Sequence, residues 1–148
     1  MLNIVIKPFN ELSILELYNL LQLRSEVFVV EQDCVYQDID GKDQNALHVI
    51  GYKNDRIVAY TRLFKPGDYF KASSIGRVVV AKNQRQFKYG YDIMEASIKA
   101  IKTHFNVTEI KISAQCYLKN FYNNLEFFEI GEEYLEDGIP HIAMLYKK

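Results

Sequence analysis

The sequence has little of what marks secreted, metal-dependent or membrane proteins. It contains only two cysteines and three histidines, and neither a CxxC nor an HExxH spacing occurs. We therefore expect no disulfide framework and no metal site. Nowhere do 18 apolar residues run together, and the first residues lack the charged-then-apolar order of a signal peptide. These two absences lead us to expect a cytoplasmic protein.

The charge balance also narrows the choice of partners. Lys and Arg number 18 and Asp and Glu 19, so the net charge is -1, and no basic cluster stands out. Proteins that bind nucleic acid or membranes ordinarily carry a basic patch, so we expect neither partner. A chain of 148 residues, 49% hydrophobic and 25% charged, suits a single globular domain over residues 1–148.

The most informative stretch is residues 75–94, where a β-branched run passes through a basic turn into an amphipathic helix. The valines at 78–80 favour a strand, and so dense an apolar run predicts burial on both faces. The helix is predicted to begin near Lys88 or Tyr89. Its first amides lack intrahelical partners, so a phosphate can bind there, assisted by neighbouring basic residues. A solvated turn has a similar composition, and the pattern alone leaves both interpretations open.

The rest of the chain alternates strands and helices without repeats or low-complexity tracts. Ser13 and Glu16 form a capping box that predicts the start of a long first helix. An irregular acidic segment, residues 33–44, follows this helix, and such loops commonly carry function. The predicted strands are residues 2–7, 48–53, 57–64, 74–81, 107–113, 127–134 and 142–146, with a short helix at 118–125.

Three stretches carry a resemblance to a known family. The valine strand and the following Arg-Gln-Phe-Lys-Tyr-Gly at residues 85–90 resemble the Q/R-x-x-G-x-G/A motif of GNAT acetyltransferases, with Lys88 replacing the first glycine. Residues 20–43 and 114–145, which include VYQDIDG and EDGIPHI, resemble the ElaA-type branch of that superfamily. The resemblance implies an α+β (mixed α/β) fold, with a mixed sheet of about six to seven strands, flanking helices and a splayed CoA cleft. It also implies direct transfer of an acetyl group from acetyl-CoA to an amine in a ternary complex.

Acetyl-CoA is expected to be held mainly by the main chain. In the family, the valine strand holds the pantetheine arm and a backbone amide at a bulge faces the acyl carbonyl. The residues that the resemblance assigns to the cofactor are Val78, Val79, Val80, Arg85, Gln86, Phe87, Lys88, Tyr89, Gly90, Tyr91 and Asn120.

The catalytic candidates are a tyrosine, a glutamate and two histidines. Tyr122 stands where many family members have a tyrosine that protonates the departing thiolate, although it can equally belong to an aromatic seam under the short helix. Glu31, at the end of the first helix, and His141, after a Gly-Ile-Pro turn, are candidates for the general base. His48 is a further alternative, because histidine titrates near neutral pH. Glu31 can equally be a surface carboxylate, and His48 can satisfy a hydrogen bond in the core.

Arg77 is unusual because it lies in a predicted buried strand, where an unpaired cation is costly. It should meet a carboxylate, either Glu31 or one on the substrate, and Arg24 on the first helix poses the same question. The residues expected near the substrate are Arg24, Tyr36, His48 and Arg77. The acidic residues Asp38, Asp40 and Asp43 either attract a cationic amine or form a solvated surface.

Other functions stay open on the sequence. A non-catalytic acyl-CoA-binding or sensing module would need residues 85–90 but neither Tyr122 nor a base. An enzyme like the acyl-homoserine-lactone synthases would share the arginine before Val-Phe, but this chain is short and has no tryptophan. A covalent route through Cys116 with His141 as base is a further option that the family chemistry does not require. The acceptor is a small molecule or peptide amine of unknown identity, and a homodimer is compatible with the sequence.

Overall fold

The order of strands and helices predicted from the sequence is the order observed. The structure, a computed structural model, describes residues 2–147. Within these residues one mixed sheet has the strand order β1-β2-β3-β4-β5-β7-β6. The strands are β1 Asn3–Pro8, β2 Leu47–Lys53, β3 Arg56–Phe64, β4 Ser73–Val80, β5 Glu109–Gln115, β6 Phe127–Glu136 and β7 Ile139–Lys147. The helices are α1 Ile14–Arg24, α2 Tyr89–Phe105 and α3 Lys119–Asn124, with a π-helical continuation of α1 at Ser25–Glu31 and short 3-10 turns at Phe9–Glu11, Asp43–Asn45, Lys82–Phe87 and Cys116–Leu118.

The predicted capping box begins α1. The Glu16 amide donates to Ser13 Oγ and the Ser13 amide donates to Glu16 Oε1, each at 3.0 Å. Lys7 Nζ and the Tyr52 hydroxyl also donate to the Glu16 carboxylate, which ties α1 to β1 and β2. Burial alone would raise the pKa of Glu16, but these hydrogen bonds outweigh it and lower the pKa to about 2.

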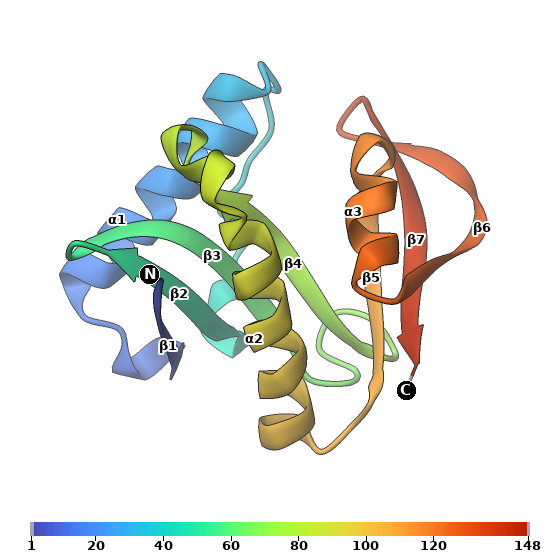
Figure 1. The fold of residues 1–148 in the computed structure, drawn as a ribbon, viewed down its shortest axis with the longest axis horizontal. Helices are drawn as coiled ribbons and strands as arrows, with labels where there is room; N and C mark the ends of the chain where they lie inside the picture. Colours follow the sequence, from blue (N-terminus) through green and yellow to red (C-terminus); the bar gives the residue numbers. More distant parts are fainter. Residues whose placement is uncertain (1, 148) are drawn as a thin grey trace.

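Two hydrophobic clusters cover the two faces of the sheet. α2 and α3 pack on one face and α1 lies on the other (Figure 1). Thr61 Oγ1 is 2.6 Å from Ser97 Oγ and so faces α2, which turns its neighbours Tyr60 and Arg62 toward α1. Because of this alternation, β3 and β4 can supply side chains to both faces.

The sheet opens between β4 and β5. The two strands pair in parallel only at Ser73 with Ile110 and at Ser74 with Lys111, after which they diverge. Val78 and Val80 are half-buried, so the expectation of a strand buried on both faces is wrong for this end of β4. The physical reason is the divergence, which leaves these side chains beside an opening instead of a neighbouring strand.

A β-bulge lies at the same place. Tyr60 pairs with Val79 and Arg62 with Gly76, so two residues of β4 oppose the single Thr61 of β3. One of the two is Arg77, whose φ of 50° lies in the left-handed region. A bulge leaves a residue outside the hydrogen-bonded ladder and bends the strand, which directs backbone groups into the opening.

The last strand begins earlier than predicted. β7 starts at Ile139, whereas the sequence interpretation placed its start at residue 142 and read the Gly-Ile-Pro segment as a turn. The turn is Asp137-Gly138, with φ values of 51° and 77°, and Pro140 already pairs with Leu135. Asp-Gly is a strong signal for a two-residue hairpin turn. Within residues 2–147, no helix has both the length and the apolar character needed to cross a membrane.

Candidate active site

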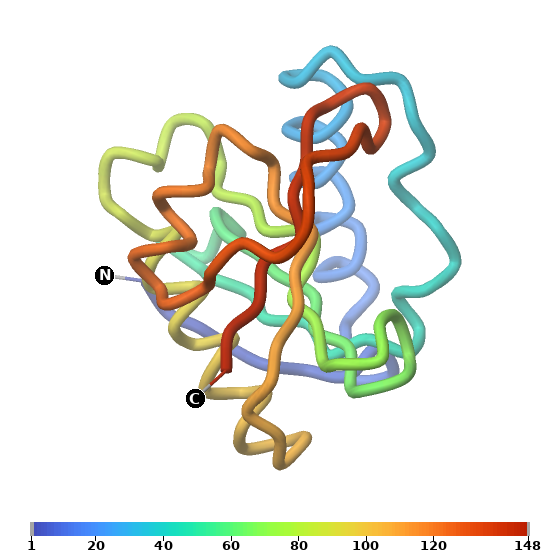
Figure 2. Tube along the Cα trace, turned by 90° about the vertical axis from the view of Figure 1, so that its right-hand side faces the viewer, coloured from blue at the N-terminus to red at the C-terminus, as the bar shows by residue number. Residues whose placement is uncertain are grey.

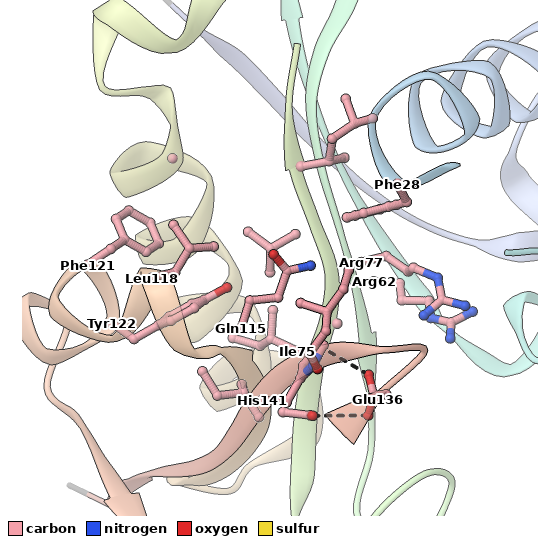
Figure 3. A pocket seen from close by; sticks show the side chains of 18 of the residues that line it. Phe28, Arg62, Ile75, Arg77, Gln115, Leu118, Phe121, Tyr122, Glu136 and His141 are labelled. Atoms are coloured by element: carbon pink, nitrogen blue, oxygen red, sulfur yellow. Dashed lines mark hydrogen bonds and ion pairs between the residues drawn. The ribbon is translucent and has the colours of Figure 1, made fainter. Parts of the chain in front are cut away.

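A cavity of about 470 Å³ occupies the opening between β4 and β5 (Figure 3). It passes through the sheet and has two differently built halves. We call one the helical half, lined on the side of α2 and α3 by Lys88, Gly90, Tyr91, Leu118, Phe121 and Tyr122. We call the other the loop half, lined by Tyr36, Arg62, Phe64, Tyr69, Phe70, Arg77, Ser113, Glu136, Asp137 and His141.

The basic turn of the helical half ends at Lys88, which adopts the left-handed conformation with φ 61° and ψ 29°. This is the position at which the family motif has glycine, and a residue with a side chain is strained there. Lys88 also precedes the first turn of α2, and no side chain caps that N-terminus. The Tyr91 amide donates to the Lys88 carbonyl at 3.2 Å, so it is the amides of Tyr89 and Gly90 that are open to an anion, with the Lys88 side chain beside them.

Packing as well as the motif favours glycine at position 90. A Cβ atom at this position would lie 3.2 Å from Phe121 Cε1 and 3.3 Å from Phe121 Cζ. The absence of a side chain thus lets α3 approach the start of α2, where both helices line the cavity.

Arg85 is held by the carboxylate of Glu31, the residue that sequence analysis made a candidate general base. Its two terminal nitrogens donate to the two Glu31 oxygens at 2.6 and 2.8 Å, and its Nε donates to the Val80 carbonyl at 3.2 Å. The hydrogen bonds from Arg85 lower the pKa of Glu31, which makes this carboxylate a weaker base. Glu31 does not line the cavity, whereas Arg85 does. These contacts argue against Glu31 as the general base.

Tyr122 combines both interpretations offered by the sequence. Its ring makes edge contacts with Phe121 and Phe127, at centroid distances of 5.0 and 6.1 Å, so it does belong to an aromatic seam. It also lines the cavity, and Figure 3 shows its hydroxyl pointing into the open space. Within residues 2–147 this hydroxyl has no hydrogen-bond partner. Burial raises the pKa of Tyr122, so the phenol stays protonated at neutral pH.

Behind the loop half lies a cluster of three arginines and three aspartates, which we call the arginine–aspartate cluster. Arg24 Nε is 2.9 Å from Asp38 Oδ2, and Arg24 Nη1 is 2.7 Å from Asp43 Oδ1. Arg77 Nε forms an ion pair with Asp38 Oδ1 at 2.7 Å. The cluster consists of Arg24, Arg62, Arg77, Asp38, Asp40 and Asp43.

The cluster changes two expectations. Arg77 does meet a carboxylate, as its position requires, but the partner is Asp38 and not Glu31. The aspartates are neither solvated nor free to attract an amine, because each is paired with arginine. Burial alone would raise the pKa values of Asp40 and Asp43, but the hydrogen bonds and charges of the arginines outweigh it and lower both pKa values.

Arg24 and His48 do not reach the cavity. Both are fully buried, and neither lines it. His48 Nε2 donates to the Asp43 carbonyl at 2.9 Å, and its Nδ1 lies 2.6 Å from the Tyr60 hydroxyl. These positions argue against direct substrate contact and favour the core hydrogen-bonding role for His48. Burial, the largest cause, lowers the pKa of His48.

His141 lies in the loop half with one ring nitrogen committed. Nδ1 is 2.7 Å from the Ile139 carbonyl, which can only accept, so Nδ1 carries a hydrogen and, in the neutral imidazole, Nε2 carries the lone pair. Nε2 lies 3.5 Å from Glu136 Oε2. Ser113 Oγ donates to the other Glu136 oxygen at 3.1 Å, and the Tyr134 hydroxyl contacts Ser113 Oγ. Sequence reasoning selected His141 but missed Glu136, although Glu136 belongs to the EDGIPHI stretch that carried the resemblance.

On the side of α1, two contacts link the segment that follows α1 to β5 and to the β6–β7 turn. The side-chain amides of Gln32 and Gln115 exchange hydrogen bonds at 3.2 and 3.3 Å. Cys34 Sγ donates to the Asp137 carbonyl at 3.2 Å. Figure 2 shows the β6–β7 hairpin approaching the segment that follows α1. These contacts connect residues 83 and 103 positions apart, and no local pattern predicts them.

The remaining candidates divide between the cavity wall and its surroundings. Cys116 does not line the cavity, and desolvation together with Glu133 raises its pKa, which disfavours a thiolate nucleophile. Predicted site residues that line the cavity are Val78, Val79, Val80, Arg85, Lys88, Gly90, Tyr91, Tyr122, Tyr36, Arg77 and His141. Those that do not are Gln86, Phe87, Tyr89, Asn120, Glu31, Arg24 and His48.

Comparison with known proteins identifies the family to which this chain belongs. A family profile described as an acetyltransferase (GNAT) domain matches residues 14–148, and the chain belongs to this family. Protein ElaA of Escherichia coli strain K12 is 45% identical over 137 residues, covering 91% of this chain and 90% of that protein. The crystal structure of E. coli ElaA matches with a TM-score of 0.92 and 42% identity, over 99% of this chain and 100% of that one.

A second solved structure supports the same assignment. An acyl-CoA N-acyltransferase from Pseudomonas aeruginosa matches with a TM-score of 0.92 and 39% identity, over 99% of both chains. The predicted family, its ElaA-like branch and the mixed-sheet fold are thereby confirmed. The acyl-CoA N-acyltransferase fold implies use of an acyl-CoA.

Proposed function

We propose that this chain is an N-acetyltransferase that moves the acetyl group of acetyl-CoA directly to an amine. The observation that carries the proposal is the continuity of one cavity from the uncapped N-terminus of α2 to His141. Two substrates that meet in one cavity need no covalent enzyme intermediate, which agrees with the position of Cys116 outside it.

The helical half fits a CoA-type molecule. Beyond Ser74, the edge of β4 that faces β5 has no strand partner within residues 2–147, so its backbone groups are available to an extended ligand. The open amides of α2, with Lys88 beside them, suit a pyrophosphate, and Arg85 can turn to the same charge if Glu31 releases it. Acetyl-CoA would supply the acetyl group as an activated thioester.

Three groups of this chain would then act on the reaction. A backbone amide freed by the bulge at Arg77 can donate to the negative charge that develops on the acyl oxygen. The protonated Tyr122 hydroxyl can donate to the departing sulfur. His141 Nε2, which has a lone pair, can accept the proton of the amine.

Calorimetric titration with acetyl-CoA and with CoA tests the proposal. We expect micromolar binding to the native protein and loss of binding in an Arg85→Glu, Lys88→Glu double variant, because the cradle then repels phosphate. A folded native protein that binds neither compound would exclude the acetyltransferase function. Binding without turnover of any amine would instead support a non-catalytic acyl-CoA-binding module.

A further inference from the structure

The loop half also contains information about the acceptor, and the inference drawn from it rests on the proposed function. Its charges are the first observation. In the arginine–aspartate cluster three cations meet three carboxylates, so Arg62 and Arg77 bring no net positive charge to the cavity wall. The wall then has two further carboxylates, Glu136 and Asp137, and within residues 2–147 neither is paired with lysine or arginine. The uncompensated charge of the loop half is therefore negative.

The second observation is His141, whose side chain is only 8% exposed. Its Nδ1 hydrogen is committed to the Ile139 carbonyl, and the Tyr134 ring stacks on it at 6.2 Å. Nε2 has no hydrogen-bond partner within residues 2–147 and is directed at Glu136, as Figure 3 shows. A buried nitrogen with a free lone pair beside a carboxylate can take a proton from a cation that the carboxylate binds.

The third observation is a wall of aromatic rings on the β3–β4 side of the loop half. Phe64 and Tyr69 stack with centroids 5.1 Å apart, and Phe70 meets Tyr69 edge-on at 4.8 Å. All three rings line the cavity. Arg62 lies behind two of them, 5.1 Å from the Phe64 centroid and 5.9 Å from that of Tyr69. This surface suits an apolar or aromatic substituent.

We propose that the acceptor is a small primary amine with an aromatic or aliphatic substituent and no carboxylate of its own. Its ammonium group binds Glu136, and its substituent contacts the rings of Phe64, Tyr69 and Phe70. The ammonium passes one proton to His141 Nε2, and the neutral nitrogen forms the new C–N bond as the C–S bond breaks. Tyr122 gives its proton to the departing sulfur, and the second proton lost by the nitrogen restores the Tyr122 hydroxyl. The products are the acetamide, the CoA thiol and one proton, which His141 returns to solvent.

A comparison of four amines tests this assignment, with CoA thiol release as the measurement on the full chain. The probes are 2-phenylethylamine, phenylalanine, which adds a carboxylate, ethanolamine, which lacks the ring, and a short lysine-containing peptide. We expect kcat/KM for 2-phenylethylamine to exceed that for each of the others by about tenfold or more. A preference for phenylalanine, ethanolamine or the peptide would overturn the inference and leave the acetyltransferase function standing. Acetyl-CoA binding without turnover of any of the four would also overturn the inference and would support the non-catalytic acyl-CoA-binding module instead.

Two variants test the named residues. Glu136→Gln is expected to raise KM for 2-phenylethylamine about tenfold while the Kd for acetyl-CoA stays unchanged, and Glu132→Gln on the same strand is the matched control. An unchanged KM in Glu136→Gln would refute the ammonium site.

His141→Gln is expected to lower kcat about 100-fold at pH 7. The defect should shrink toward pH 9.5, because more of the amine is then already neutral. A defect that is constant with pH would refute the proton transfer. Failure of the native protein to bind acetyl-CoA would refute the proposed function itself, which separates the two failures.

Discussion

The two halves of the cavity are built in different ways. The helical half comes from two short segments, the end of the basic turn with the start of α2 and, about 30 residues later, the turn at Cys116–Leu118 with α3. Its chemistry depends on backbone conformation, as at Lys88, and on unpaired amides. The loop half gathers side chains from Tyr36 to His141 and depends on charge pairing. Under the proposed function, the acyl donor would be recognised by local chain geometry and the acceptor by long-range packing.

The largest effect should come from the cluster behind the loop half. Arg24→Met would remove the fully buried one of two arginine partners from Asp38 and one of two arginine partners from Asp43, and we expect the free energy of unfolding to fall by about 3–5 kcal/mol. Urea unfolding measures this loss. Lys147→Gln, which removes an exposed partner of Glu109, is the control and should change stability by less than about 0.5 kcal/mol. Equal effects would mean that the cluster does not hold the loop half together.

The next effect concerns the side chain that acts in the helical half. Tyr122→Phe keeps the ring in its aromatic seam and removes only the hydroxyl, so we expect kcat to fall by about 100-fold with an unchanged Kd for acetyl-CoA. Steady-state kinetics and calorimetry together measure both quantities. Tyr18→Phe, on the exposed face of α1, is the matched control. If the two variants behaved alike, Tyr122 would have a packing role only.

Acid should weaken the loop half. Hydrogen bonds from arginine hold the pKa values of Asp40 and Asp43 below the ordinary 3.8, so folding is favoured by their ionised forms. Their contribution to stability is complete above about pH 4 and is lost as the pH falls through the lowered values. Unfolding free energies measured at pH 6, 4 and 3 should fall less steeply in an Asp43→Asn variant than in the native protein. Parallel curves would contradict this assignment.

The smallest effect distinguishes Glu31 from a catalytic base. Glu31→Gln removes the carboxylate that holds Arg85, so we expect acetyl-CoA to bind about two- to fivefold more tightly at low salt. Calorimetric titration beside Glu26→Gln, an exposed residue of the same π-helical segment, provides the comparison. Loss of turnover in Glu31→Gln alone would restore this residue as the base.

Sequence reasoning succeeded where the signal is local. The capping box of Ser13 and Glu16 predicted the start of α1, and the valine run with its basic turn predicted that the next helix begins near Lys88 or Tyr89, where α2 begins at Tyr89. It failed where the partner is remote. A buried Arg77 requires a carboxylate, but the sequence does not reveal which one, and the true partner lies on the acidic segment that was predicted to be solvent-exposed or substrate-binding. The contact of Gln32 with Gln115 had no sequence signal at all.

The short pairing of β4 with β5 has a consequence for solubility. Two strands that separate after Ser74 and Lys111 create unpaired sheet edges in the interior of the sheet. Such edges invite a further strand from another chain and so favour aggregation. Here the two edges face each other inside a cavity. On the side of α1, the Gln32–Gln115 contact bridges the opening between them. An occupant of the cavity would also shield these edges, so ligand binding should suppress self-association of the protein.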